Sequence, residues 1–113
     1  MTTEPLKPLR PIEVEDCSRF IAPKSMKDAA KLNDKMTAHN ERLAQHRVAV
    51  EAAKRGEVTG DPFAYRERLI REGVELVVAN LELVEARRSL RQTLLVELSR
   101  SMQHGRQNST RQR

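Results

Sequence analysis

Apolar side chains recur at helical spacing along most of this chain, and the longest such pattern covers residues 61–102. Apolar residues three and four positions apart share one face of an α-helix, so this stretch predicts a single long amphipathic helix. Asp61 is suited to cap its start and Pro62 to its first helical position, whereas Gly73 is a weak point inside it. The apolar positions form two neighbouring stripes. The first stripe is Ile70, Val74, Val77, Leu81, Val84, Leu95, Leu98 and Met102, and the second is Leu69, Leu76, Leu83, Leu90 and Leu94.

A second amphipathic stretch, residues 25–55, predicts a shorter helix. The run from Ser25 to Asp28 resembles a capping box with Asp in place of the usual Glu or Gln, and Gly56 suits the left-handed residue that follows a helix. The seam alternates intervals of three and four residues, as in a coiled coil, but it is narrow and built largely of small or polar side chains. Its members are Ala29, Leu32, Met36, His39, Leu43, His46, Val50 and Ala53.

Residues 56–60 form a connection so short that the second helix must return antiparallel to the first. The sequence therefore predicts an all-α fold, an antiparallel helical hairpin over residues 25–102. Residues 1–24 hold four of the five prolines and predict an extended arm outside the core. Two PxxP patterns within residues 5–11 fit either a ligand of an SH3-like domain or simply an extended arm. Four apolar anchors predict that the arm docks on a neighbouring subunit or partner, namely Ile12, Val14, Phe20 and Ile21.

The supply of apolar side chains is poorly matched between the two predicted helices. Hydrophobic residues make up 38% of the chain and aromatic residues 3%, so a self-contained core would be thin. The long helix carries more apolar surface than the lean first helix can bury, and contiguous exposed apolar surface usually marks an interface. We therefore expect a second hairpin or a larger assembly to cover the second stripe. The predicted protein interface is Leu69, Ile70, Val74, Val77, Leu81, Val84, Leu90 and Leu94.

The net charge of +5 is concentrated at one end of the chain. Residues 1–86 carry 14 basic and 15 acidic side chains, whereas residues 87–113 carry seven arginines and one glutamate. We expect residues 103–113, which contain no apolar or acidic residue, to be a disordered basic tail. The basic quarter fits either sequence-independent contact with phosphates or a solubilising, solvated surface. The candidate phosphate contacts are Arg87, Arg88, Arg91, Arg100, Arg106, Arg111 and Arg113.

No motif for catalysis, for a cofactor or for a metal ion emerges from the sequence. His39 and His46 share a helix face but are seven residues apart, about 10 Å along the axis, which is too far to hold one metal ion. They fit polar positions in a seam that fix register, or a pH-sensitive interface. Cys17 lies among acidic residues, which raise the pKa of a thiol, so we expect it to be unreactive. We expect a protein that is not an enzyme and needs no cofactor.

The interpretation that these patterns favour is an assembly subunit or adaptor that acts by helix packing, within a virion, a secretion apparatus or another complex. The alternative is a nucleic-acid-binding accessory protein that uses the basic C-terminal quarter. In layout the chain resembles inner-rod subunits of bacterial needle-type secretion systems, with a loose front, a first helix, an Asp61-Pro62 start and a long terminal helix. No signal peptide and no membrane span are predicted, so we expect a cytoplasmic protein or a component of an assembly.

Overall fold

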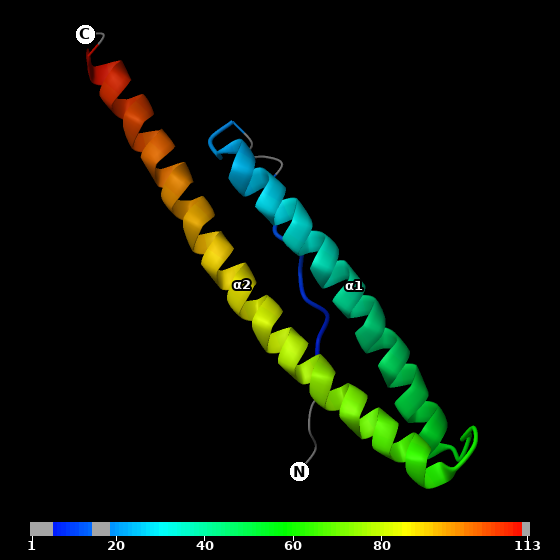
Figure 1. Ribbon diagram of the computed structural model, residues 1–113. Helices are drawn as coiled ribbons and strands as arrows, with labels where there is room; N and C mark the ends of the chain where they lie inside the picture. Colours follow the sequence, from blue (N-terminus) through cyan, green and yellow to red (C-terminus); the bar gives the residue numbers. More distant parts are fainter. Residues whose placement is uncertain (1–5, 15–18, 112–113) are drawn as a thin grey trace.

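The computed structural model describes residues 6–14 and 19–111, with side chains described as far as Gln103. Its two elements are helix α1, Pro23–Lys54, and helix α2, Pro62–Arg111. They run antiparallel, as Figure 1 shows, and α2 continues well beyond the start of α1. No strand occurs in the described part of the chain. The predicted all-α fold, a helical hairpin, is confirmed.

The hairpin loop has the cap chemistry that the sequence predicted. Gly56 has a φ of +83°, and the Gly56 and Glu57 amides donate to the carbonyls of Ala53 and Ala52 at 3.0 Å each. This pair of hydrogen bonds is the Schellman motif, which satisfies carbonyls that the last helical turn leaves unpaired. At the start of α2, the Asp61 carboxylate accepts a hydrogen bond from the Phe63 amide at 3.3 Å. Both ends of the turn are thereby fixed by local side chains and backbone.

The start of α1 differs from the prediction, because the helix begins at Pro23 and its N-cap is Ala22, which has no capping side chain. Ser25 is therefore inside the first turn and is not the cap residue. Its hydroxyl donates to Glu97 Oε1 at 2.7 Å, and the Ala22 amide donates to Glu97 Oε2 at 3.2 Å. A carboxylate from α2 thus caps α1, where a negative charge also complements the helix dipole. Capping by a residue 72 positions away leaves no local sequence signal.

The core of the hairpin is narrow and lies between α1 and one face of α2. Every position of the predicted α1 seam is buried or half-buried, and Met36 and Leu76 are the largest fully buried side chains. The second stripe of α2 faces this core, with Leu94 buried and Leu83 and Leu90 packed against it. The expectation that another chain covers the second stripe is therefore wrong. The surplus of apolar surface lies on the first stripe, about 100° further round the helix.

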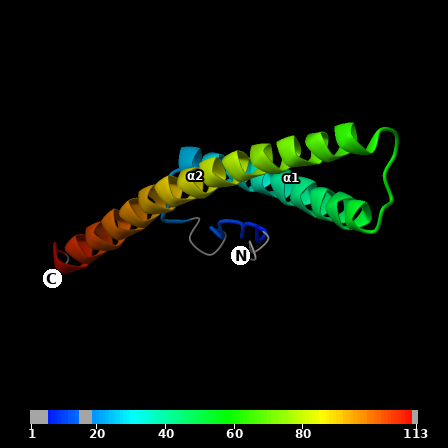
Figure 2. The same ribbon diagram turned by 90° about the horizontal axis from the view of Figure 1, so that it is seen from below.

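The N-terminal arm does join the core, contrary to the prediction. Ile12 and Ile21 are buried with Leu32, Met36 and Leu94 in one apolar cluster. Figure 2 shows the arm running along one side of the helix pair. In the single chain the arm lies on its own hairpin. The apolar anchors outweigh the extended, proline-rich backbone because burying an isoleucine side chain contributes about 1.5–3 kcal/mol.

The C-terminal segment also departs from its prediction, because α2 continues as a helix to Arg111. Residues 103–111 are helical and not a disordered tail, while residues 112–113 lie outside the described part. The molecule is a rod of 77 × 27 × 17 Å with a radius of gyration of 21.0 Å. A compact domain of this length has a radius of gyration of about 13 Å. The extra length leaves a large surface for its volume.

Candidate protein interface

The inner part of the site is a ladder of hydrogen bonds that holds the arm on α1. The Leu9 amide donates to Asn40 Oδ1 at 2.8 Å, and Asn40 Nδ2 donates back to the Leu9 carbonyl at 3.0 Å. Asn33 makes the same two bonds with Ile12, at 2.8 and 3.0 Å. Arg47 adds a third rung by donating to the Leu6 carbonyl at 3.2 Å. Each asparagine thus pairs with the arm as a neighbouring β-strand would, through one donor and one acceptor.

The rungs occur every seven residues on α1 and every three residues on the arm. Seven helical residues rise about 10.5 Å, and three residues of polyproline II rise about 9.3 Å, so the two repeats nearly match. The arm carries the corresponding triplets Pro5-Leu6-Lys7, Pro8-Leu9-Arg10 and Pro11-Ile12-Glu13. In each triplet the second residue faces the hairpin, and the described first and third residues are exposed. The sequence analysis missed this ladder, although the triplets and the heptad spacing of Asn33, Asn40 and Arg47 are visible signals.

The outer part of the site is an apolar stripe on α2 that the described residues leave largely exposed. We call it the outer stripe. Its side chains are between 45% and 71% exposed, although all are large and hydrophobic. Helix α1 cannot reach them, because it packs on the face centred on Leu76 and Leu94. The outer stripe consists of Phe63, Ile70, Val74, Val77, Val78, Leu81, Leu95, Val96 and Met102.

The eight residues predicted as a protein interface divide between these two environments. Four of them, Ile70, Val74, Val77 and Leu81, belong to the outer stripe. The other four turn partly or wholly toward the chain's own core: Leu69, Val84 and Leu90 are half-buried, and Leu94 is buried. Five residues of the outer stripe are missing from the predicted interface, namely Phe63, Val78, Leu95, Val96 and Met102. Periodicity alone did not distinguish the two faces, because both stripes are equally apolar in sequence.

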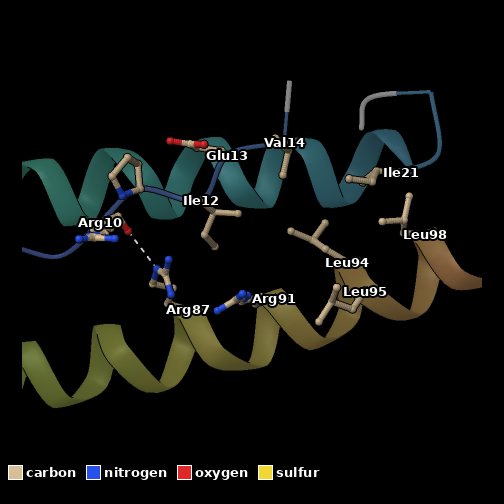
Figure 3. A pocket seen from close by; sticks show the side chains of 11 residues that line it. Arg10, Ile12, Glu13, Val14, Ile21, Arg87, Arg91, Leu94, Leu95 and Leu98 are labelled. Carbon is tan, nitrogen blue, oxygen red and sulfur yellow. Dashed lines mark hydrogen bonds between the residues drawn. The ribbon is translucent and has the colours of Figure 1, made fainter. Parts of the chain in front are cut away.

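Two cavities border the outer stripe. One, of about 760 Å³, opens at the hairpin end where the helices diverge, and it is lined mainly by apolar side chains that include Phe63, Leu69 and Ile70. The other, of about 650 Å³, lies between the arm and α2, and Figure 3 shows its apolar end beside Ile21 and Leu98. Both are open grooves where apolar surface stays in contact with water, so both extend the surface that a partner could bury.

Three of the seven candidate phosphate contacts, Arg87, Arg88 and Arg91, line one groove beside the arm together with Lys7 and Arg10, and no acidic residue lines this groove. Arg87 is half-buried and its Nε donates to the Arg10 carbonyl at 2.9 Å, so it helps to hold the arm (Figure 3). Arg88 is exposed and lies 3.9 Å from Glu85. Arg91 lines the cavities beside the arm. Arg100 is exposed, the side chains of Arg106 and Arg111 are not described, and Arg113 lies outside the described residues.

The two histidines are structural neighbours of the helix contact. His39 is buried, and its Nε2 lies 3.2 Å from Asn80 Oδ1 on α2, while no described group pairs with its Nδ1. His46 Nδ1 lies 3.1 Å from Glu72 Oε1, and its ring packs against Gly73. Each histidine therefore joins the α1 seam to α2 at its own level of the hairpin. Whether the two residues fix the register or make an interface pH-sensitive stays a prediction. Cys17 lies outside the described residues.

Among the described residues, no group of three or more His, Cys, Asp or Glu side chains is arranged to hold a metal ion. No helix in the described part of the chain has the length and apolar character needed to cross a bilayer. No protein-family model, curated protein or solved structure matches the chain. The resemblance in layout to inner-rod subunits therefore gains no support from any family match.

Proposed function

We propose that this chain is a non-enzymatic assembly subunit or adaptor, which binds a protein partner through the outer stripe of α2. The observation that carries the proposal is a set of exposed branched and aromatic side chains along one face of an ordered helix, closely spaced from Ile70 to Leu81. Soluble monomers rarely expose apolar patches of this extent, whereas protein interfaces do. The arm and α1 act as the support, because they pack against another face of α2, where Leu83, Leu90 and Leu94 lie.

The total surface supports the same proposal. The chain exposes 9478 Å². A compact monomer of this mass exposes about 6,300 Å², so roughly 3,000 Å² remains that a typical domain would bury. Stable protein interfaces bury about 800 Å² on each partner. The exposed surface is therefore large enough for one or more partners to bind while α1 and α2 stay packed together.

A labelling experiment in cells tests this proposal. In a Cys17→Ser background, Leu81→Cys places a single thiol in the middle of the outer stripe, and Val48→Cys places one on the exposed side of α1. In dilute purified protein both thiols should react rapidly with a maleimide. Inside the cells that make the protein, Cys at position 81 should be protected and Cys at position 48 should not. Equal reactivity of the two positions in cells would contradict the proposal.

The nucleic-acid alternative remains a separate candidate, supported by the charge of residues 87–113 and by the groove that Lys7, Arg10, Arg87, Arg88 and Arg91 line. Sequence-blind phosphate binding weakens steeply with salt. Removing residues 103–113 should abolish retention on nucleic acid if this alternative holds, and should leave assembly intact if the adaptor proposal holds. Leu81→Glu should have the opposite pattern, because a carboxylate in the outer stripe blocks apolar packing. Solution mass, measured with and without nucleic acid at two salt concentrations, distinguishes the two.

A further inference from the structure

We propose that the groove between the arm and α2 binds the linked phosphate groups of a small polyphosphate, such as a nucleoside triphosphate. We call it the cationic groove. It has a volume of about 620 Å³, and its five basic lining residues are Lys7, Arg10, Arg87, Arg88 and Arg91. The inference goes beyond the proposed function and does not rest on it, since the binding surface differs from the outer stripe.

The first observation is that positive charge gathers here from two segments that are far apart in the sequence. Two basic residues come from the arm and three from α2, and no acidic residue is among the described residues that line the groove. Glu13 lines the neighbouring cavity and forms no ion pair in the described structure, and Glu85 reaches Arg88 only at 3.9 Å on an exposed surface. A cleft lined by charge of one sign concentrates ions of the opposite sign, so the expected occupant is an anion.

The second observation is that the donors of these side chains are available to a ligand. Among the described residues, Lys7, Arg10 and Arg91 have no side-chain hydrogen bond or ion pair, and all three are exposed. Arg87 uses its Nε to donate to the Arg10 carbonyl at 2.9 Å, which leaves its two terminal nitrogens for a ligand (Figure 3). A guanidinium group presents its donors as a planar fork that matches the oxygens of a phosphate.

The spacing of the basic residues favours a short chain of phosphates. Lys7 and Arg10 are three residues apart on the extended arm, which is about 9 Å. Arg87 and Arg91 are four residues apart on α2, which is about 6 Å. A nucleic-acid strand instead needs a cationic surface that follows its backbone over several nucleotides. The next arginine on α2, Arg100, is about 13 Å beyond Arg91 and does not line the groove, so a small polyphosphate fits better than a strand.

The remaining lining residues suit a nucleoside attached to the phosphates. Asn80 and Gln92 provide side-chain amides, which both donate and accept hydrogen bonds, and Val84 and Leu95 provide apolar surface for a base. The Asn80 Oδ1 lies 3.2 Å from a histidine nitrogen of α1, which leaves the Nδ2 of the same amide for a ligand. Sites for small ligands combine apolar walls with a few polar groups and have volumes of about 300–1,000 Å³, so the cationic groove is of the right size.

The cationic groove is complete only while the arm is docked, because Lys7 and Arg10 belong to the arm. In the absence of an anion, repulsion between these two charges and the three on α2 opposes docking. A bound polyphosphate removes this repulsion. Linkage then requires that the ligand favours the docked arm by the same factor by which docking of the arm favours the ligand.

Titration calorimetry of the purified chain with inorganic tripolyphosphate and with ATP, in magnesium-free buffer, tests the site. Arg10→Gln and Arg91→Gln should each weaken binding of both probes about tenfold, because each removes one charge-assisted contact. Arg100→Gln removes the same charge from α2 outside the groove and should change the affinity less than about twofold. Equal weakening by Arg100→Gln would overturn the inference, as would the absence of binding by either probe.

The two probes also distinguish the sources of the phosphate chain. Tighter binding of ATP would support a nucleoside-bearing ligand that uses the amides and apolar surface, and equal binding would support recognition of the phosphate chain alone. In the full-length chain, Arg106→Gln together with Arg111→Gln should leave the affinity for tripolyphosphate unchanged. Binding of an oligonucleotide but of neither small probe would overturn the inference in favour of the nucleic-acid alternative.

Hydrogen exchange tests the coupling between the groove and the arm. Saturating tripolyphosphate should slow exchange at the Leu9 and Ile12 amides about fivefold, because the ligand stabilises the docked arm. Exchange that is unchanged by a bound probe would overturn the assignment of the site to this groove. None of these readouts involves protection of position 81 in cells, so the inference and the proposed function are tested separately.

Discussion

The two faces of α2 are nearly equal in apolar content, yet they meet opposite environments. Leu94 is 6% exposed and packs against the arm and α1, while its neighbour Leu95 is 56% exposed. The same holds five helical turns earlier, where Leu76 is 1% exposed and its neighbour Val77 is 45% exposed. The difference shows that hydrophobicity alone does not decide burial in an elongated hairpin. Whether an apolar side chain of α2 is buried depends on where α1 and the arm pack against it.

The largest expected difference between the two faces is the change in the free energy of unfolding when one leucine on each face is replaced by alanine. Leu76→Ala should lower the free energy of unfolding by about 2–5 kcal/mol, because it leaves a cavity between the helices. Leu81→Ala is the same chemical change on the outer stripe and should alter the value by no more than about 0.5 kcal/mol in the monomer. Denaturant unfolding of the dilute purified chain measures both free-energy changes. Equal losses would show that the outer face is buried in the free chain.

The second prediction concerns the arm, which together with α1 covers the buried face of α2. Asn33→Ala together with Asn40→Ala removes two rungs of the ladder and should destabilise the arm by about 2 kcal/mol, roughly 1 kcal/mol for each rung. Hydrogen exchange at the Leu9 and Ile12 amides should become faster, since these donors lose their partners. Gln45→Ala, an exposed change on the same helix, is the control. Unchanged exchange in the double variant would show that apolar contacts alone hold the arm.

The third prediction tests the cap that ties the far end of α1 to α2. Glu97→Ala should cost about 1 kcal/mol of stability, since it leaves the Ser25 hydroxyl and the Ala22 amide without their acceptor. Glu97→Gln should cost less, because an amide oxygen still accepts a hydrogen bond but no longer complements the helix dipole. The exposed change Glu82→Ala is the matched control in the thermal unfolding measurement. A loss no greater than that of the control would contradict the capping role.

The sequence predicted the features that are encoded locally. Helical periodicity, the Asp61 cap and the Gly56 cap are each carried by residues within one or two turns, and the structure has all three. The features that it missed depend on contacts over long sequence separations. Glu97 caps Ser25 from 72 residues away, and Asn40 pairs with Leu9 from 31 residues away. The choice of which stripe becomes the interface belongs to the second group, because it depends on where α1 and the arm pack.

The smallest predicted effect concerns Gly73, at the border between the two faces. A Cβ at this position would lie 3.3 Å from His46 Nε2, which is tight but not prohibitive. Both residues line the hairpin-end cavity, so the imidazole has room to move by a few tenths of an ångström. Alanine is favoured over glycine within a helix by about 1 kcal/mol, and we expect Gly73→Ala to stabilise the hairpin by about half of this. In a His46→Ala background the same change should give the full gain, which a double-mutant cycle on unfolding free energies measures. If the gain is identical in both backgrounds, the imidazole of His46 does not hinder a Cβ at position 73. The contact with His46 would then not explain why this position carries a glycine.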